Sequence, residues 1–330
     1  MLDVGSERSS RPSPANDRAL AVSARILVIR GGAIGDFILT LPAIRLLREN
    51  FPDARIEILG YQHIVSLAEG RYYAAATRSI EYGAMAGFFI PHSELAPDLV
   101  EYFAGFHQIV SYLFDPDGHF EANLRRAGAK NILRAFAKID DSDHAARQLA
   151  RPLQSLALYI EDAAATIHLT DEDHAFAARF LAECDGRPLI ALHPGSGSPR
   201  KNWPLEKWSR LGRVLLDRAP QILLIGGEAD EDRVAALCAA WQDAPVLVAR
   251  HLPLPQLAAL LARARLFIGH DSGISHLAAA VGAPCLLLFG PTDPAVWAPA
   301  NPQVRVLTAP NGELAALSVE TVASEARRML

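Results

Sequence analysis

The sequence predicts an α/β protein with two domains, each built around a parallel sheet. Apolar runs typical of buried strands alternate with helical patterns, and this alternation begins near residue 25 and again near residue 188. The length of 330 residues is enough for two separate cores. We therefore expect two Rossmann-like halves joined around residues 160–185.

The first alternation begins with a buried strand at residues 25–30. A helix is expected from about residue 36 to 50, and the next strand covers residues 55–59. Such a βαβ unit implies parallel strands with a right-handed crossover. Less regular elements follow, with strands expected at residues 107–113 and 131–135.

The second alternation repeats this order of strands and helices. Strands are expected at residues 189–193, 221–225, 266–268, 285–289 and 304–307. Helices are expected at residues 205–218, 228–241 and 254–262, after residue 272, and at residues 318–328. The predicted organisation is a disordered tail (1–23), an N-terminal domain (24–170) and a C-terminal domain (171–330) whose last helix is a candidate to pack back on the N-terminal domain.

Composition argues against several classes of protein. Hydrophobic residues make up 50% of the chain and the net charge is -5, which fits a globular protein and disfavours nucleic-acid binding. Cys184, Cys238 and Cys285 include no Cys-x-x-Cys pair, so neither a zinc site nor a disulfide framework is expected. The tail lacks the apolar core of a signal peptide, and no run of about 18 apolar residues predicts a membrane span. We expect a cytoplasmic protein.

The most informative segment is His270–His276. An apolar strand ends there, and Asp271, Ser272 and Gly273 precede a helical pattern. A helix start carries roughly half a positive charge and free N–H groups, so a phosphate is expected beside Ser272 and Gly273. Helix capping alone explains Asp271 and Ser272 about equally well.

Two other interpretations of this segment fit poorly. In Gly-His-Asp-Ser-Gly the serine stands one position later than in the G-x-S-x-G motif of serine hydrolases. His270, Asp271 and His276 lack the helical i, i+4 pair of histidines that is typical of a zinc site.

A glycine-rich loop with Gly31, Gly32 and Gly35 follows the first strand and ends at Asp36. It is not a dinucleotide fingerprint, because the first glycine of G-x-G-x-x-G would fall on Arg30, and no Gly-Lys-Ser/Thr follows as in a P-loop. The glycines let a substrate approach the backbone closely. Asp36 is either a helix-capping carboxylate or a general base, ionised at neutral pH.

A second loop at residues 193–204 follows the first strand of the second half. In it, Ser196 and Ser198 alternate with glycines and precede Arg200 and Lys201. Backbone N–H groups, hydroxyls and an ammonium group together make an anion cradle.

A third loop, Gly226-Gly227-Glu228, follows another strand. Its carboxylate could accept hydrogen bonds from both hydroxyls of a ribose, or simply favour the start of a helix. All of these loops lie at carboxyl ends of strands, where ligands bind in such sheets.

Residues 125–138 contain several cations. We interpret them as a solvated face, and the alternative is a basic rim for an anionic acceptor. The residues are Arg125, Arg126, Lys130, Arg134 and Lys138.

Taken together, these loops resemble glycosyltransferase family 9, the heptosyltransferases of lipopolysaccharide core assembly. The matching stretches are Arg30–Asp36 with Leu39–Ala43, His193–Gly195 with Lys201–Pro204, Gly226–Glu228, and Asp271–His276 with Ala283–Pro284 and Phe289–Thr292. Their order and spacing hold over residues 25–310. One departure is Ser-Gly-Ser at positions 196–198, where several members of the family carry threonines.

The resemblance implies a GT-B fold with an interdomain cleft and an inverting transfer of heptose from ADP-heptose to a lipopolysaccharide core or related sugar. It implies no cofactor and no metal, because the ADP-sugar is a substrate. The implied roles are catalytic base for Asp36, phosphate contact for Lys201, ribose contact for Glu228, and donor-site turn for Asp271, Ser272, Gly273 and His276. Ser196 and Ser198 are expected donor contacts, Leu252 is a spacing-based candidate for an adenine contact, and Gly31, Gly32 and Gly35 form the acceptor-side loop.

Other functions remain open at this point. They are a GT-B enzyme with a different donor, an epimerase, or a non-catalytic protein that binds sugar nucleotides. The family's acceptor implies a lipid-linked sugar, and therefore transient attachment at the inner face of the inner membrane.

Overall fold

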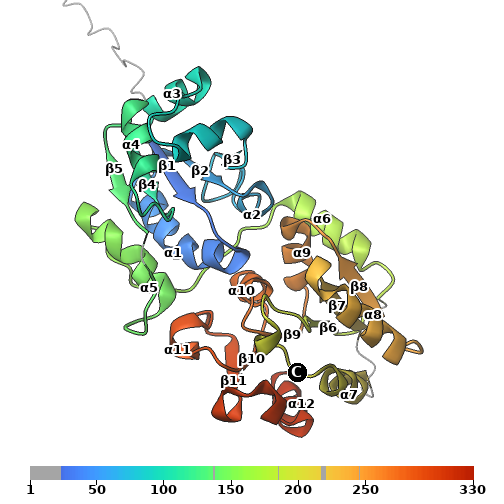
Figure 1. Cartoon of the computed structure of the whole chain (residues 1–330). Helices are drawn as coiled ribbons and strands as arrows, with labels where there is room; N and C mark the ends of the chain where they lie inside the picture. Colours follow the sequence, from blue (N-terminus) through green and yellow to red (C-terminus); the bar gives the residue numbers. More distant parts are fainter. Residues whose placement is uncertain (1–23, 137, 185, 217–220, 245) are drawn as a thin grey trace, which may run out of the picture.

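The computed structural model describes residues 24–136, 138–184, 186–216, 221–244 and 246–330, without the side chain of Glu228. The predicted disordered tail (1–23) lies outside the described residues. Two parallel sheets, each in its own domain, confirm the predicted α/β fold (Figure 1). Among the described residues, none of the helices combines the length and hydrophobicity needed to cross a bilayer.

The N-terminal domain contains a five-stranded parallel sheet in the order β3-β2-β1-β4-β5. The strands are β1 (Arg25–Arg30), β2 (Arg55–Gly60), β3 (Ala76–Ser79), β4 (Gln108–Ser111) and β5 (Ile132–Arg134). The helices are α1 (Ile34–Asn50), α2 (Gln62–Val65), α3 (Pro97–Ala104), α4 (His119–Arg126) and α5 (Ala145–Ala150), with 3-10 turns η1 (Gly83–Phe89) and η2 (Arg151–Leu156). Ile26 and Val28 of β1 belong to the core that includes α1, whereas Leu27 and Ile29 belong to the core that includes α3 and α4. Burial on both faces explains why β1 is a continuous apolar run.

The C-terminal domain contains a six-stranded parallel sheet in the order β11-β10-β9-β6-β7-β8. The strands are β6 (Leu189–Leu192), β7 (Gln221–Gly226), β8 (Val246–Arg250), β9 (Leu266–His270), β10 (Cys285–Phe289) and β11 (Val304–Thr308). The α-helices are α6 (Asp171–Phe180), α7 (Leu205–Leu216), α8 (Glu231–Ala240), α9 (Leu254–Leu261), α10 (Gly273–Ala280), α11 (Pro294–Trp297) and α12 (Val319–Met329). The 3-10 turns are η3 (Pro199–Lys201), η4 (Glu228–Asp230), η5 (Pro310–Gly312) and η6 (Leu314–Ala316).

Most expected elements are present, but some differ, and helix α6 lies in a stretch where only the join between the two halves was expected. Helix α1 begins two residues early, and the helix expected at 228–241 is a 3-10 turn followed by α8. Strands β3 and β8 were not expected, because β3 reads Ala-Thr-Arg-Ser and has no apolar run, while β8 is only half-buried at the sheet edge. The expectation that the last helix packs back on the N-terminal domain is wrong. Helix α12 packs against α7, because its apolar face joins the core of the C-terminal domain.

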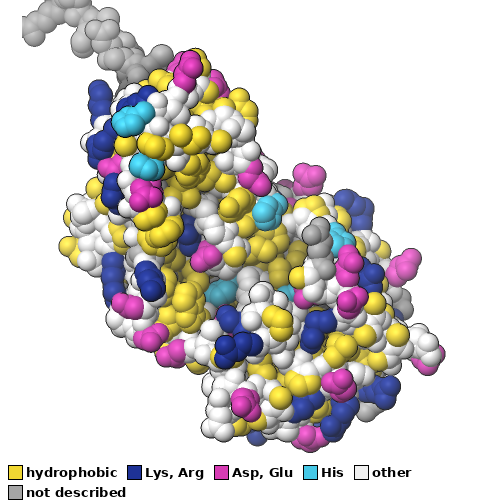
Figure 2. All heavy atoms as spheres, viewed as in Figure 1, with side chains coloured by type: hydrophobic (Ala, Val, Ile, Leu, Met, Phe, Trp, Pro, Cys, Tyr) yellow, Lys and Arg dark blue, Asp and Glu magenta, His cyan; other side chains and the backbone are white. Residues whose placement is uncertain are grey.

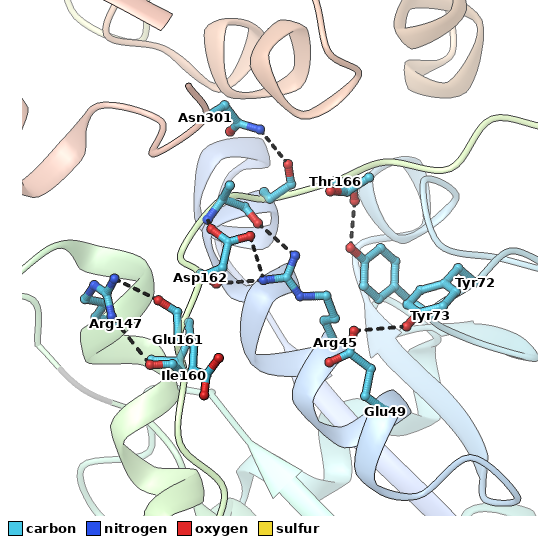
Figure 3. A network of polar contacts seen from close by, with 12 residues as sticks. Arg45, Glu49, Tyr72, Tyr73, Arg147, Ile160, Glu161, Asp162, Thr166 and Asn301 are labelled. Atoms are coloured by element: carbon cyan, nitrogen blue, oxygen red, sulfur yellow. Dashed lines mark hydrogen bonds and ion pairs between the residues drawn. The ribbon is translucent and has the colours of Figure 1, made fainter. Parts of the chain in front are cut away.

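The connection between the domains is hydrogen-bonded to both of them (Figure 3). On the N-terminal side, Arg45 of α1 donates to the carbonyl oxygen of Asp162 at 2.7 Å, and the Tyr73 hydroxyl donates to that of Thr166 at 2.7 Å. On the C-terminal side, the side-chain amide of Asn301 donates to the carbonyl oxygen of Ala165 at 2.9 Å. Adjacent residues of the connection are therefore tied to opposite domains.

Candidate active site

The starts of two helices from different domains meet at the domain junction (Figure 1). Helix α1 begins at Ile34 and α10 begins at Gly273. A Cβ atom added to Gly273 would lie 2.8 Å from the Ile34 Cβ and 3.0 Å from the backbone nitrogen of Gly35. Because each helix start carries partial positive charge, this junction favours an anion.

Three cavities adjoin this junction. The interdomain cavity, of about 610 Å³, lies between Gly32–Gly35 and Tyr61 on one side and Gly226, Leu252 and Ser272 on the other. The N-terminal cavity, of about 520 Å³, is lined mainly by that domain, including Arg30, Asp36, Tyr112, Phe114, Phe136 and Lys138. The junction cavity, of about 270 Å³, is lined by Asp36, Ser198, Lys201, Asp271, Ser272, Gly273 and His276.

Asp36 lines both the N-terminal cavity and the junction cavity. Its Oδ2 accepts a hydrogen bond from the backbone N–H of Ala33 at 2.9 Å, so the carboxylate does cap α1. Its Oδ1 lies 3.3 Å from Nη2 of Arg30, and 45% of the side chain is exposed. Capping therefore uses one oxygen and leaves the carboxylate accessible to a substrate in either cavity.

Arg30 holds the first turn of α1 from the end of β1. Its Nε donates to Oγ1 of Thr40 at 2.9 Å, and its Nη2 donates to the carbonyl oxygen of Asp36 at 3.2 Å. Burial lowers the pKa of Arg30, and the neighbouring Asp36 carboxylate offsets part of that effect. The sequence identified Arg30 as the residue that breaks the dinucleotide fingerprint and as the start of a family-matching stretch, but assigned it no role in the site, although a cation at the end of a buried strand was itself a signal.

Lys201 faces the junction cavity from the second loop. Its Nζ lies 2.6 Å from Oδ2 of Asp271, and the Thr292 hydroxyl donates to the same oxygen at 2.8 Å. The Asp271 side chain is 10% exposed, whereas that of Lys201 is 31% exposed. Asp271 therefore fixes the position of the ammonium group and leaves part of that group open to a ligand.

The loop that carries Lys201 is anchored by His270 and Arg233. Nε2 of the buried His270 accepts the backbone N–H of Trp203 at 2.9 Å, so its Nδ1–H donates to the Gly195 carbonyl oxygen at 3.2 Å. Burial lowers the pKa of His270 to about 3, which keeps the ring neutral at pH 7. Arg233 donates to the carbonyl oxygens of Pro194 at 3.0 Å and Trp203 at 2.8 Å.

Ser272 lies at the start of α10 and accepts a hydrogen bond from the Ser275 backbone N–H at 3.4 Å. Its hydroxyl is 3.4 Å from Nδ1 of His193, whose Nε2 is 3.4 Å from Oδ2 of Asp230. Burial opposes ionisation of Asp230, but the hydrogen bond and charge of His193, the backbone N–H of Gly227 and the charge of Arg233 together outweigh it and lower the pKa of Asp230. A Ser-His-Asp chain is thus present, with separations longer than the 2.6–3.2 Å typical of nucleophile activation, and its serine caps a helix.

His276 is buried at the junction and lines the cavity there. Burial lowers its pKa to about 4, so the ring is neutral at pH 7 and can accept or donate one hydrogen bond at each nitrogen. Among the described residues, no group of three or more His, Cys, Asp or Glu side chains is placed to hold a metal ion.

The interdomain cavity brings Leu252 into an apolar wall with Ile225, Leu254 and Leu257. Such a wall suits the flat face of a nucleobase. Ser196 lines the same cavity, but its hydroxyl donates to the carbonyl oxygen of Ser198 at 2.8 Å and so stabilises its own loop.

Glu228 and the three glycines of the first loop complete the set of predicted site residues. Glu228 lies in the turn after β7, and its side chain is outside the described part of the structure. Of the acceptor-side glycines, Gly31 lines the N-terminal cavity, Gly35 lines the interdomain and junction cavities, and Gly32 lines the N-terminal and interdomain cavities.

The basic segment at 125–138 is divided between the two interpretations given to it. Arg125 and Arg134 both pair with Glu121, and Arg126 donates to the carbonyl oxygen of Ser93 at 3.0 Å, so these three guanidinium groups make contacts within their own domain. Lys138 lines the N-terminal cavity, as a basic rim would require. The sequence did not identify Tyr112, Phe114 or Phe136, because no motif surrounds them.

Two facing α/β domains, with helix starts, a lysine and a carboxylate at their junction, form a site suited to an anionic substrate. The family model of glycosyltransferase family 9 (heptosyltransferase) matches residues 128–326. The chain belongs to this family and is a glycosyltransferase.

Individual relatives extend the likeness over most of the chain. Lipopolysaccharide heptosyltransferase 3 of Escherichia coli is 27% identical over 291 residues, which is 80% of this chain and 83% of the relative. A glycosyl transferase family 9 structure from Veillonella parvula is 20% identical, with a TM-score of 0.79 over 93% of this chain and 97% of the other. The E. coli heptosyltransferase WaaC with ADP is 21% identical, with a TM-score of 0.69 over 93% and 100% of the two chains. These structures confirm the GT-B arrangement of the two domains.

Proposed function

We propose that the chain is an inverting glycosyltransferase that moves heptose from ADP-heptose to a sugar of the lipopolysaccharide core. One observation carries this proposal: Asp36 lies where the N-terminal cavity meets the junction cavity that contains Lys201. An acceptor hydroxyl in the first cavity and a donor phosphate in the second would both reach the reacting centre. The relatives named lipopolysaccharide heptosyltransferase support the choice of substrates.

The mechanism follows from the charges at the junction. Asp36 takes the proton of the acceptor hydroxyl as its oxygen forms a bond to the anomeric carbon. The bond between that carbon and the diphosphate oxygen breaks on the opposite face, so the configuration inverts. ADP leaves with additional negative charge, which Lys201 and the N–H groups at the start of α10 stabilise.

The donor would lie across two cavities. Its diphosphate occupies the junction cavity beside Lys201 and Ser272, and its adenine packs on the apolar wall at Leu252. We infer that no metal is required, because a lysine and a helix start already supply the positive charge that a magnesium ion would otherwise bring. Glu228 remains the candidate ribose contact.

Titration calorimetry with ADP and with UDP tests the donor assignment. Both nucleotides are titrated with and without magnesium into the wild type, Lys201→Ala and the matched control Lys130→Ala. The expected result is binding of ADP without magnesium that weakens only in Lys201→Ala. Preference for UDP would move the function to a different GT-B enzyme such as an epimerase, and failure to bind either nucleotide would refute both an ADP-sugar and a UDP-sugar as the donor.

A lipid-linked acceptor would bring the enzyme to the inner face of the inner membrane. We infer transient attachment there, supported by Lys138, which lines the N-terminal cavity. Flotation with vesicles containing anionic lipid tests it. Failure to co-migrate at low salt would contradict the membrane contact and leave the transfer reaction untouched.

A further inference from the structure

Two phenylalanine side chains stand together at the carboxyl ends of neighbouring strands. Phe114 follows β4 and Phe136 follows β5, and their ring centroids are 5.1 Å apart. Phe114 is 69% exposed and Phe136 is 45% exposed. Hydrophobic side chains gather on this domain along the face that borders the interdomain hollow (Figure 2). Paired exposed rings beside a cavity are typical of a ligand contact.

The ring pair separates two cavities. On one side lies the N-terminal cavity with Asp36. On the other lies a cavity of about 260 Å³ that also includes Phe120, Glu121 and Arg134, and that we call the outer cavity. Both rings line both cavities, so the two spaces adjoin along the rings.

We propose that the outer cavity is a second acceptor subsite, which binds the saccharide unit adjacent to the sugar that receives the transferred residue. This inference rests on the proposed function, because it requires the reacting sugar to lie beside Asp36. A bound acceptor then runs from the base, across the faces of Phe114 and Phe136, into the outer cavity. The enzyme recognises two linked units, although only the first unit reacts.

The chemistry of the walls favours a saccharide as the occupant. The face of an aromatic ring carries partial negative charge and attracts the partially positive C–H groups on the flat side of a sugar. The floor contains the buried side chains of Phe120 and Leu124, and the ion pair of Glu121 and Arg134 lines the same cavity. Sugar hydroxyls can hydrogen-bond to these charged groups. An acyl chain would remove them from water without replacing the lost hydrogen bonds.

Transfer assays on two probes test the subsite. The probes are the deacylated oligosaccharide of heptose-free lipopolysaccharide and the monosaccharide that forms its terminal unit. For Phe114→Ala and Phe136→Ala, we expect kcat/KM to fall about tenfold with the oligosaccharide and to stay unchanged with the monosaccharide. The matched control is Phe51→Ala, which removes a 39% exposed phenylalanine at the end of α1 in the same domain.

Saturation-transfer NMR gives a second measurement that needs no turnover. In the wild type, saturation should pass from the protein to the terminal unit of the oligosaccharide and to the unit next to it. In Phe136→Ala, saturation should reach the terminal unit only. Saturation of the terminal unit alone in the wild type, or no saturation of either probe, would overturn the subsite.

The remaining outcomes separate this inference from the proposed function. Equal losses on both probes would place the rings against the reacting sugar, and losses confined to acylated acceptor would place an acyl chain in the outer cavity. Either result overturns the second subsite and leaves heptosyl transfer intact. Failure of the wild type to bind ADP would refute the proposed function, while the NMR result would still decide whether the outer cavity binds a saccharide.

Discussion

Replacing Gly273 by alanine should separate the two helix starts that form the junction. The added Cβ would lie 2.8 Å from the Ile34 Cβ and 3.0 Å from the backbone nitrogen of Gly35. Carbon atoms of packed side chains approach to about 3.5–4.0 Å, so α1 and α10 must move apart by about 1 Å. The backbone of Gly273 has no positive φ, and the effect therefore comes from packing alone.

The size of the effect follows from how the overlap is relieved. Overpacking of a tight contact costs about 1–3 kcal/mol. Because the contact joins two domains, opening of the junction relieves it, and the opening moves Asp36 away from Lys201. A misplacement of about 1 Å at a reacting centre lowers a rate by up to about a hundredfold. We therefore expect a 10- to 100-fold loss of transfer, which is about 1.4–2.8 kcal/mol in activation free energy, with a smaller loss in the free energy of unfolding.

Two other glycine variants serve as graded comparisons for Gly273→Ala. In Gly35→Ala the new Cβ would lie 3.4 Å from Cδ2 of His276, so the loss of transfer should be smaller. In Gly83→Ala the new Cβ meets no atom within 4 Å, and wild-type behaviour is expected. Transfer is followed by the release of ADP, and unfolding by urea titration. If Gly273→Ala matches Gly83→Ala in both measurements, the helix starts do not need their close contact and the reasoning fails.

Further substitutions test single contacts of the site. Asp36→Asn should lower transfer by orders of magnitude with ADP affinity nearly unchanged, as compared by steady-state rates and calorimetry; near-normal turnover would refute the base assignment. Asp271→Asn should weaken ADP binding less than Lys201→Ala does, because the ammonium group remains but loses its anchor, and the reverse order in calorimetry would contradict that role. His270→Ala should cost about 2–4 kcal/mol of unfolding free energy because it leaves two buried backbone groups unpaired, whereas the exposed His174→Ala should cost almost nothing. Burial holds the pKa of His270 at about 3, below its ordinary 6.5, so between these pH values the unfolded chain binds a proton that the folded chain does not. The free energy of unfolding of the wild type should therefore decrease as pH falls from 6.5, by up to about 1.4 kcal/mol per pH unit from this residue. A urea midpoint that does not change between pH 7 and pH 5 would contradict this expectation.

The loops that we assign to the donor could be located from the sequence, because each of them is local in sequence. Ser272 and Gly273 follow a strand and start a helix, and Lys201 follows a glycine-rich turn. Parallel strands bring their carboxyl ends to one edge of a sheet, so these separate loops had to converge. What the sequence could not show was the pairing of Lys201 with Asp271 across 70 positions, since both side chains also suited independent roles.

The N-terminal cavity, which we assign to the acceptor, could not be predicted, because its walls come from side chains without a motif. Tyr112, Phe114 and Phe136 belong to short strands and the loops after them, and only the pairing of β4 with β5 brings the two phenylalanines together. The sequence showed the cation-rich stretch at residues 125–138, but its side chains take different positions in the structure. Arg134 pairs with Glu121, and Lys138 lines the N-terminal cavity.

The contact between α1 and α10 fixes the distance between Asp36 and the turn at Ser272. Gly35 immediately precedes Asp36, and Gly273 immediately follows Ser272. Because these glycines let the two backbones approach each other, the distance between the carboxylate and the anion-binding turn is set by the contact of α1 with α10. Any motion that opens the domains must therefore separate the base from the leaving group. When the domains are apart this contact is lost, and an acceptor hydroxyl beside Asp36 then has no donor within reach.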